Sequence, residues 1–313
     1  MHLKPNSTAF IFPGQGSQAL GMGRELAEQY PAAKQTFEQA DQTLGFPISK
    51  LMWDGPEQEL NDTINTQPAL LVHSVAALRV FQGRYPEFSP AFVAGHSMGE
   101  LSALVAGGSL PYPDALNLVR RRGELMKRAG DVGPGAMAAI LGLDIHTLED
   151  ICAQATQGED VVQVANDNCP GQVVISGARG ALERAVEMAQ AAGARRAVIL
   201  AVSIAAHSPL MAHAQGDFNK TVDAAPIAAP SPPIIANITA KPMHTADQVR
   251  ADLRGQLTNR VRWTESVQAM VDKGVTTFLE IGSGSVLCGL NKRIDRQINC
   301  MTLGTPADFE ALD

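Results

Sequence analysis

The sequence predicts an α/β protein in which a small domain is inserted into a large one. In the outer parts of the 313-residue chain, short apolar runs alternate with segments of helical composition, as expected for a sheet covered by helices. Between these parts, the order strand, helix, strand, strand, helix, strand is the ferredoxin-like pattern. We therefore expect residues 133–202 to form the small domain, and residues 1–132 and 203–313 to form the large one.

The elements follow from apolar runs and from the turn residues that bound them. The run from Thr8 to Phe12 ends at Pro13 and a glycine-rich turn, and the run from Ala91 to Ala94 leads directly into the letters GHSMG. For the large domain, strands are predicted at 8–12, 91–94, 234–239 and 276–282, and helices at 20–40, 67–82, 98–106, 114–129 and 263–273. For the small domain, strands are predicted at 137–143, 161–166, 172–177 and 196–202, and helices at 145–155 and 181–193.

The composition excludes several classes of partner and compartment. The formal net charge of -7 comes without long basic runs, which argues against nucleic acid as the main partner. The chain has no stretch of about 18 apolar residues and no signal-peptide pattern, so we expect a cytoplasmic protein that does not enter membranes. Its four cysteines lie far apart without a CxxC pair, which argues against a zinc site and a disulfide framework.

Ser97 is the candidate nucleophile. It stands in Gly95-His96-Ser97-Met98-Gly99, which fits the G-x-S-x-G elbow between a strand and a helix. In such an elbow, the glycines permit a strained turn that holds the serine above a parallel sheet. The alternative is that Ser97 only caps the following helix.

His207 is the preferred general base among the seven histidines. It follows the last strand of the insertion, where the chain re-enters the large domain, and His213 is the reserve candidate. The other five fit other roles: His73 is expected in the core, His96 should point away from Ser97, and His2, His146 and His244 read as solvated. No acidic partner can be named for the histidine, so a Ser-His dyad is open as well as a triad.

Arg122 stands where an arginine is not expected. On a helix of about 100° per residue, it falls in the middle of an apolar stripe that contains Leu118, Leu125 and Met126. A buried guanidinium needs an anion. That anion is either an internal carboxylate or the carboxylate of a substrate, held in a bidentate grip.

The glycine-rich turn has two interpretations. Gly14, Gly16 and Ala19 satisfy G-x-G-x-x-[GA], but no second strand ending in an acidic residue follows to hold a ribose, which argues against a dinucleotide site. The alternative is that this loop supplies backbone N–H groups facing the elbow, as the second half of an oxyanion hole.

Taken together and in this order, eight motifs resemble the malonyl-CoA:acyl carrier protein transacylase family over essentially the whole chain. They are FPGQGSQ (12–18), TQPAL (66–70), GHSMGE (95–100), the RRRGELM segment (120–126), GAMAAILGL (135–143), NDNCPGQVVISG (166–177), HSPLM (207–211) and EIGSGSVLCGL (280–290). The resemblance implies an α/β-hydrolase-like large domain with a ferredoxin-like insertion.

The resemblance also implies roles for site residues. Ser97 would be the nucleophile, His207 the base, and Arg122 the partner of the malonyl carboxylate. The backbone amides of Gln15 and Met98 would form the oxyanion hole. The main-chain carbonyl of Gln256 would orient the histidine, and Gln67 would line the acyl pocket. Met98 replaces the more usual leucine, which roughly conserves volume. Ala206 stands where polyketide-synthase relatives that prefer malonyl units often carry a bulkier phenylalanine, which puts strict exclusion of methylmalonyl groups in doubt.

The expected partners are malonyl-CoA and an acyl carrier protein, with no metal or redox cofactor and a monomeric enzyme. The expected reaction is acyl transfer through a serine ester in fatty acid biosynthesis, or in polyketide synthesis or malonate metabolism. Two rival functions stay open: an esterase or thioesterase that releases the acyl group to water, and a non-catalytic module that docks carrier proteins.

Overall fold

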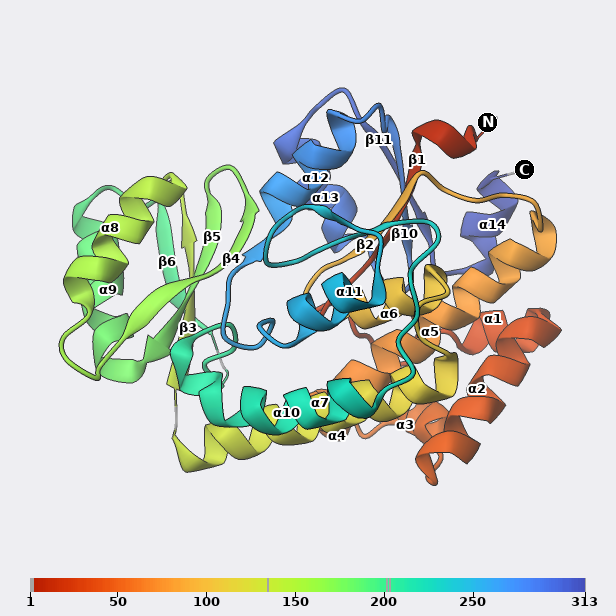
Figure 1. Ribbon diagram of the computed structural model, residues 1–313, viewed down its shortest axis with the longest axis horizontal. Coiled ribbons are helices and arrows are strands. Elements are labelled where there is room, and N and C mark those ends of the chain that lie inside the picture. The colour runs from red at the N-terminus through yellow and green to blue at the C-terminus, as the bar shows by residue number, and fades with distance from the viewer. Residues whose placement is uncertain (1–2, 134, 201, 203, 313) are drawn as a thin grey trace.

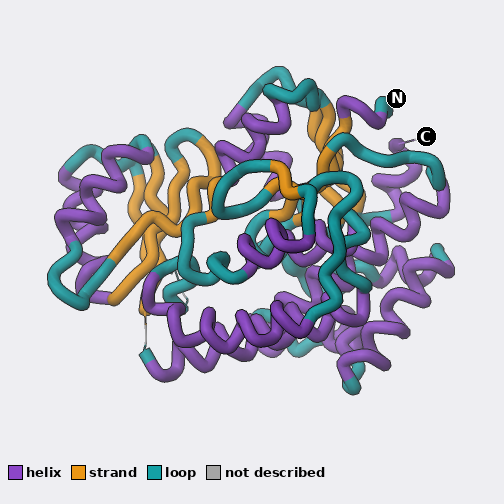
Figure 2. The backbone as a smooth tube through the Cα atoms, in the orientation of Figure 1, coloured by secondary structure: helices purple, strands orange, loops and turns teal. Residues whose placement is uncertain are grey.

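The computed structural model describes residues 3–133, 135–200, 202 and 204–312, and it has the predicted α/β architecture. The strands gather into two separate groups (Figure 2). The larger group lies among most of the helices, and the smaller group lies at one end of the molecule with its own two helices, α8 and α9 (Figure 1).

The large sheet has six strands in the order β11-β10-β1-β2-β7-β8. Its strands are β1 (Thr8–Phe12), β2 (Phe92–Gly95), β7 (Ile234–Ile235), β8 (Pro242–Met243), β10 (Thr277–Ile281) and β11 (Asn299–Leu303). All neighbours are parallel except β7 and β8. Phe12 pairs with Gly95, so the loops that follow β1 and β2 leave the same edge of the sheet.

Helices cover both faces of this sheet. They are α1 (Arg24–Gln29), α2 (Pro31–Leu44), α3 (Ile48–Asp54), α4 (Glu57–Leu60), α5 (Thr63–Arg84), α6 (Gly99–Ala106), α7 (Tyr112–Val132), α10 (Ala212–Ala224), α11 (Ala246–Leu253), α12 (Trp263–Val271), α13 (Val286–Ile294) and α14 (Pro306–Leu312). Because side chains alternate along a strand, Phe10 and Phe12 pack into one core with α5, α6 and α7, whereas Ala9 and Ile11 pack into another with α12 and α13.

The small sheet has the order β6-β3-β5-β4-β9. Strands β3 (Gly135–Leu141), β4 (Val162–Cys169), β5 (Gln172–Ala178) and β6 (Arg196–Ile199) pair with one another antiparallel. Helices α8 (Ile145–Ala155) and α9 (Arg179–Ala191) bury a separate core against them. This is the order of a ferredoxin-like sheet. A fifth strand, β9 (Val261–Arg262), comes from outside the insertion and pairs with β4, which the sequence did not indicate. The predicted boundaries at 133 and 202 stay predictions; residues 134, 201 and 203 lie outside the described part.

Three predictions about local structure are wrong. The segment 20–40 is not one helix, because α1 begins only after the left-handed Gly23 and Pro31 starts a second helix, α2. The strand predicted at 234–239 has only two residues. The cysteine spacing argued against disulfides, but Cys288 of α13 and Cys300 of β11 form one, since the packing of α13 on β11 brings their Cα atoms to 5.3 Å. Cys152 and Cys169 are free and buried.

Candidate active site

Ser97 stands in a strained turn between β2 and α6. Its φ of 52° is in the left-handed region, which few residues other than glycine adopt. The glycines on either side are required by space: a Cβ on Gly95 would lie 2.0 Å from the Gly99 carbonyl, and one on Gly99 would lie 2.3 Å from the carbonyl oxygen of Phe12. Ser97 does not cap the helix, because Met98 is the N-cap residue and Ser97 Oγ points to His207.

His207 is buried beside Ser97, with Nε2 2.8 Å from Ser97 Oγ. Its Nδ1 lies 2.8 Å from the carbonyl oxygen of Gln256 and 3.1 Å from that of Asn259. A carbonyl only accepts, so Nδ1 carries the proton and Nε2 presents its lone pair to the serine. Burial, with a smaller contribution from the Arg122 charge, lowers the pKa of His207 to about 3, so the imidazole is neutral at physiological pH. Two main-chain carbonyls take the place of the missing acid.

Arg122 of α7 completes a cluster with Ser97. Its side chain is 1% exposed, and it donates to Ser97 Oγ at 3.1 Å, to Gln67 Oε1 at 2.7 Å and to Gln256 Oε1 at 3.1 Å. Within the described residues no carboxylate forms an ion pair with it, so the internal ion pair weighed as an alternative is not seen. Burial lowers the pKa of Arg122 to about 10, which still leaves it charged at neutral pH. A guanidinium has five N–H groups, so two are left for a ligand.

The candidate oxyanion hole lies where the loops after β1 and β2 meet. Gln15 and Met98 each follow the paired residues Phe12 and Gly95 by three positions. The two loops touch closely, since a Cβ on Gly14 would lie 2.6 Å from the carbonyl oxygen of His96. Neither the Gln15 nor the Met98 N–H donates a hydrogen bond to any residue in the described part of the chain. Both groups are therefore available at one edge of the sheet.

The two predicted glutamines both contact Arg122. Gln67 is fully buried, accepts from Arg122 and donates to Thr63 Oγ1 at 2.9 Å. Gln256 was assigned only a main-chain role, but its side chain also bridges Arg122 and the carbonyl oxygen of Ser97, which lies 3.1 Å from Gln256 Nε2.

Two buried residues of this site were missed at the sequence level. The side chain of Asn237 accepts from the Ser97 N–H and donates to the Gly95 carbonyl, both at 2.8 Å, and so holds the elbow from both sides. Glu100 is fully buried in the first turn of α6 and accepts from the Asn237 N–H at 3.2 Å. The only available signal for Glu100 was a carboxylate inside an apolar helix, and Asn237 carries none.

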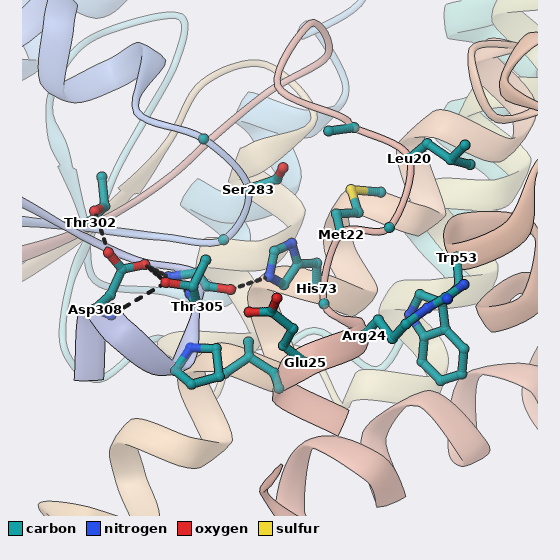
Figure 3. A pocket seen from close by; sticks show the side chains of 18 of the residues that line it. Leu20, Met22, Arg24, Glu25, Trp53, His73, Ser283, Thr302, Thr305 and Asp308 are labelled. Carbon is teal, nitrogen blue, oxygen red and sulfur yellow. Dashed lines mark hydrogen bonds between the residues drawn. The ribbon is translucent and has the colours of Figure 1, made fainter. Parts of the chain in front are cut away.

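The other histidines lie away from this cluster. His96 Nε2 is 2.8 Å from Asn168 Oδ1, pointing away from Ser97 as expected. His73 is buried, as expected of a core residue, and its Nε2 donates to the Gly304 carbonyl at 2.8 Å. It borders a cavity of about 740 Å³ formed by segments 19–26, 282–285 and 304–306, which Figure 3 shows around His73. Neither Ser97 nor Arg122 lines this cavity. His213 is exposed on α10, and His2 lies outside the described residues.

The described residues contain neither a candidate metal site nor a candidate membrane span. No group of three or more His, Cys, Asp and Glu side chains is placed to hold a metal ion there. No helix in the same part of the chain is both long and apolar enough to cross a membrane.

Comparison with known proteins gives consistent matches along almost the whole chain. The family described as acyl transferase domain matches residues 9–301. The chain is 46% identical to the malonyl CoA-acyl carrier protein transacylase of Bacillus subtilis over 302 residues, covering 96% of this chain and 95% of that one. It is 44% identical to the Escherichia coli K12 protein of the same name over 303 residues, covering 97% of each.

Solved structures agree with these matches. An acyl carrier protein S-malonyltransferase from Vibrio cholerae superposes with a TM-score of 0.95 at 44% identity, covering 98% of this chain and 100% of that one. A malonyl-transacylase solved in complex with a type II polyketide acyl-carrier protein gives a TM-score of 0.94 at 43% identity, covering 97% and 98%. At these identities the likeness extends to the whole two-sheet architecture.

Proposed function

The chain belongs to the acyl transferase family, and from this membership we propose that it moves a malonyl group from malonyl-CoA, through an ester on Ser97, to the phosphopantetheine thiol of an acyl carrier protein. The single observation that carries the chemistry is the position of Ser97 Oγ, 2.8 Å from His207 Nε2 and 3.1 Å from the Arg122 guanidinium. A nucleophile with a base on one side and a free cation on the other suits an acyl donor that bears its own carboxylate.

In the first half-reaction, His207 Nε2 takes the hydroxyl proton of Ser97 as Oγ attacks the thioester carbonyl. The oxyanion of the tetrahedral intermediate accepts hydrogen bonds from the Gln15 and Met98 N–H groups. The C–S bond then breaks, and the CoA thiolate leaves with the proton held by His207. In the second half-reaction, the base takes the proton of the carrier thiol, the thiolate attacks the malonyl ester, and Ser97 recovers its proton.

Arg122 selects the acyl group. In the free enzyme it donates to the Ser97 hydroxyl, and two further N–H groups are left for the distal carboxylate of malonate. A bidentate pair in a buried site fixes the thioester carbonyl against Ser97, which is the proximity part of catalysis. An acetyl group cannot make this contact. The small, half-buried Ala206 beside the base leaves room at the acyl α-carbon, so we expect methylmalonyl groups to be accepted in part.

We further propose that the enzyme is a cytoplasmic monomer that needs no metal or redox cofactor, with residues 133–202 as a separate domain. The acid-base chemistry above uses only side chains and main-chain groups of this chain, which supports independence from a cofactor. The separate core of the small sheet supports the domain division.

The test is an intact-protein mass spectrum after brief mixing with malonyl-CoA, with acetyl-CoA as a competing donor. We expect a malonyl adduct on the wild type, none on Ser97→Ala, and an acetyl adduct in its place on Arg122→Ala. Arg121→Ala is the matched control, because Arg121 is exposed on the same helix and forms an ion pair with Glu124. Free malonate without an adduct would identify an esterase, and carrier binding without an adduct would identify a docking module; either result refutes the proposal.

A further inference from the structure

Two carboxylates are buried together beneath the candidate active site. Glu100 of α6 is 0% exposed and Asp252 of α11 is 5% exposed, and the two side chains lie in hydrogen-bonding contact. Asp252 Oδ1 accepts from the Ile238 N–H at 3.1 Å, and no N–H or hydroxyl group of the described residues reaches Asp252 Oδ2, which leaves that oxygen for a proton shared with Glu100. Two ionised carboxylates cannot share a buried site without a proton between them. Burial and this contact raise the pKa of Glu100 well above its usual range, so the pair holds one proton and one negative charge.

The other contacts of Glu100 lead directly to Arg122. One Glu100 oxygen accepts from the Asn237 N–H, and the other accepts from Gln256 Nε2. Gln256 Nε2 also donates to the carbonyl oxygen of Ser97, while Gln256 Oε1 accepts from Arg122 Nε. A carbonyl can only accept and a guanidinium can only donate, so these partners allow a single orientation of the Gln256 amide.

This arrangement explains how a guanidinium can be buried and still be free to bind. No carboxylate of the described residues forms an ion pair with Arg122. The Glu100–Asp252 pair holds one negative charge, and from this pair Glu100 acts on Arg122 through space and raises its pKa against the effect of burial. The negative charge of the Glu100–Asp252 pair compensates the positive charge of Arg122 from the other side of the Gln256 amide. The edge of Arg122 that faces Ser97 is therefore not occupied by an internal anion.

We propose that Glu100 is the positioning residue of this carboxylate-binding site: it fixes the Gln256 amide with its oxygen toward Arg122, and so determines how strongly Arg122 discriminates a carboxylated acyl group from a neutral one. The inference deepens the proposed function and rests on it. Glu100 donates the shared hydrogen to Asp252, and both Glu100 oxygens still accept, one from the Asn237 N–H and the other from Gln256 Nε2.

The first test compares Glu100→Gln with Asp252→Asn by the ratio of malonyl to acetyl adduct in competition. In Glu100→Gln an N–H group faces the N–H of Gln256 or of Asn237. The Gln256 amide keeps its contacts with Ser97 and Arg122 but loses the support of Glu100, so its oxygen is held less firmly against Arg122. Hydrogen bonds to charged groups are strong enough that we expect this ratio to fall about tenfold or more. Asp252→Asn places an amide where the shared proton was, so the ratio should stay within about threefold. A general loss of folding would lower both adducts together and leave the ratio unchanged.

The second test covers the case that Glu100→Gln does not fold. Gln256→Leu removes the amide but keeps the main-chain carbonyl that faces His207, and we expect it to lower the ratio as much as Glu100→Gln. The double variant should lower it no further, because both changes act on one path.

Three results would overturn the inference. They are an unchanged ratio in a Glu100→Gln or Gln256→Leu variant whose total adduct matches the wild type, additive losses in the double variant, and an equal loss in Asp252→Asn. If the wild type itself forms no malonyl-serine, the proposed function fails and the inference fails with it. If the wild type prefers malonyl to acetyl and the variants show the same preference, the inference about Glu100 is rejected and the proposed function still stands.

Discussion

Asn237→Ala tests whether the geometry of the elbow, and not only its residues, is needed for activity. Asn237 binds the N–H of Ser97 and the carbonyl of Gly95, each at 2.8 Å, and it is 3% exposed. Ser97 stands at φ 52°, a conformation that persists only where the surroundings hold it. Alanine removes both contacts and leaves two buried backbone groups unpaired.

The expected loss of stability follows from those two groups. An unpaired buried donor or acceptor costs about 1–3 kcal/mol, so the free energy of unfolding should fall by about 2–6 kcal/mol. For a chain of this length, about 2.1 cal/mol/K of unfolding entropy per residue converts this to a Tm lower by roughly 3–9 °C. Activity should fall more than stability does, because a shift of about 1 Å in Ser97 Oγ costs about 100-fold in turnover.

The assay is the burst of CoA released on mixing with malonyl-CoA, measured with thermal melting of the same sample. Asn291→Ala is the matched control, since Asn291 is also a fully buried asparagine that accepts from Trp263 Nε1 at 3.0 Å, and in the described part of the chain it makes no hydrogen bond to the elbow residues 95–99. We expect it to lower Tm without changing the burst rate. A burst rate in Asn237→Ala within threefold of the wild type would refute the reasoning, and Asn237 would then serve stability alone.

Three further predictions concern the base, the elbow glycines and the cysteines. Since the pKa of His207 is lowered to about 3, kcat/KM for malonyl-CoA should be flat from about pH 8 to about pH 5, and an inflection near 6.5 would contradict a neutral buried base. The unfolded histidine still titrates near 6.5, so the free energy of unfolding should decrease as the pH falls below that value. Gly95→Ala should abolish activity and destabilise the fold, because its Cβ would overlap the Gly99 carbonyl. Gly216 lies on an exposed helix face, where a new Cβ would meet no described atom within 4 Å beyond its chain neighbours and its own helix backbone, so Gly216→Ala should raise the free energy of unfolding by about 0.5–1 kcal/mol in thermal melts. A thiol titration of the unfolded protein should find two free cysteines before reduction and four after it, and finding four at the start would show that Cys288 and Cys300 are not paired.

Sequence reasoning located the parts of the site whose signals are local. The elbow is five contiguous residues, and its two glycines and its place between strand and helix are visible in the letters. Arg122 was visible because a cation in the middle of an apolar stripe contradicts the helical pattern around it. His207 was less distinct, since only its position at the return from the insertion separated it from His213.

The rest depends on contacts between distant segments. Asn237 and Gln256 lie in irregular segments 140 and 159 residues from Ser97, and no periodicity reports where such segments pack. The roles of Gln15, Gln67 and Gln256 came from family resemblance and not from their own patterns. The disulfide was missed for the same reason. Cys288 lies in a helix and Cys300 in a strand, and the spacing of the two cysteines in the sequence does not show that this helix packs on this strand.

The pairing of β9 with β4 matters for anyone who exchanges small domains between relatives. A chimaera cut at the ends of the insertion would pair the donor's β4 with the recipient's residues 261–262, so a mismatch there would leave unpaired backbone groups at the edge of the new sheet. The donor segment should therefore include residues 261–262 along with the insertion. Because that segment lies between Gln256 and Trp263, such an exchange also alters the chain that presents its carbonyl to His207. Modular exchange in this architecture thus reaches the catalytic base even when every site residue is kept.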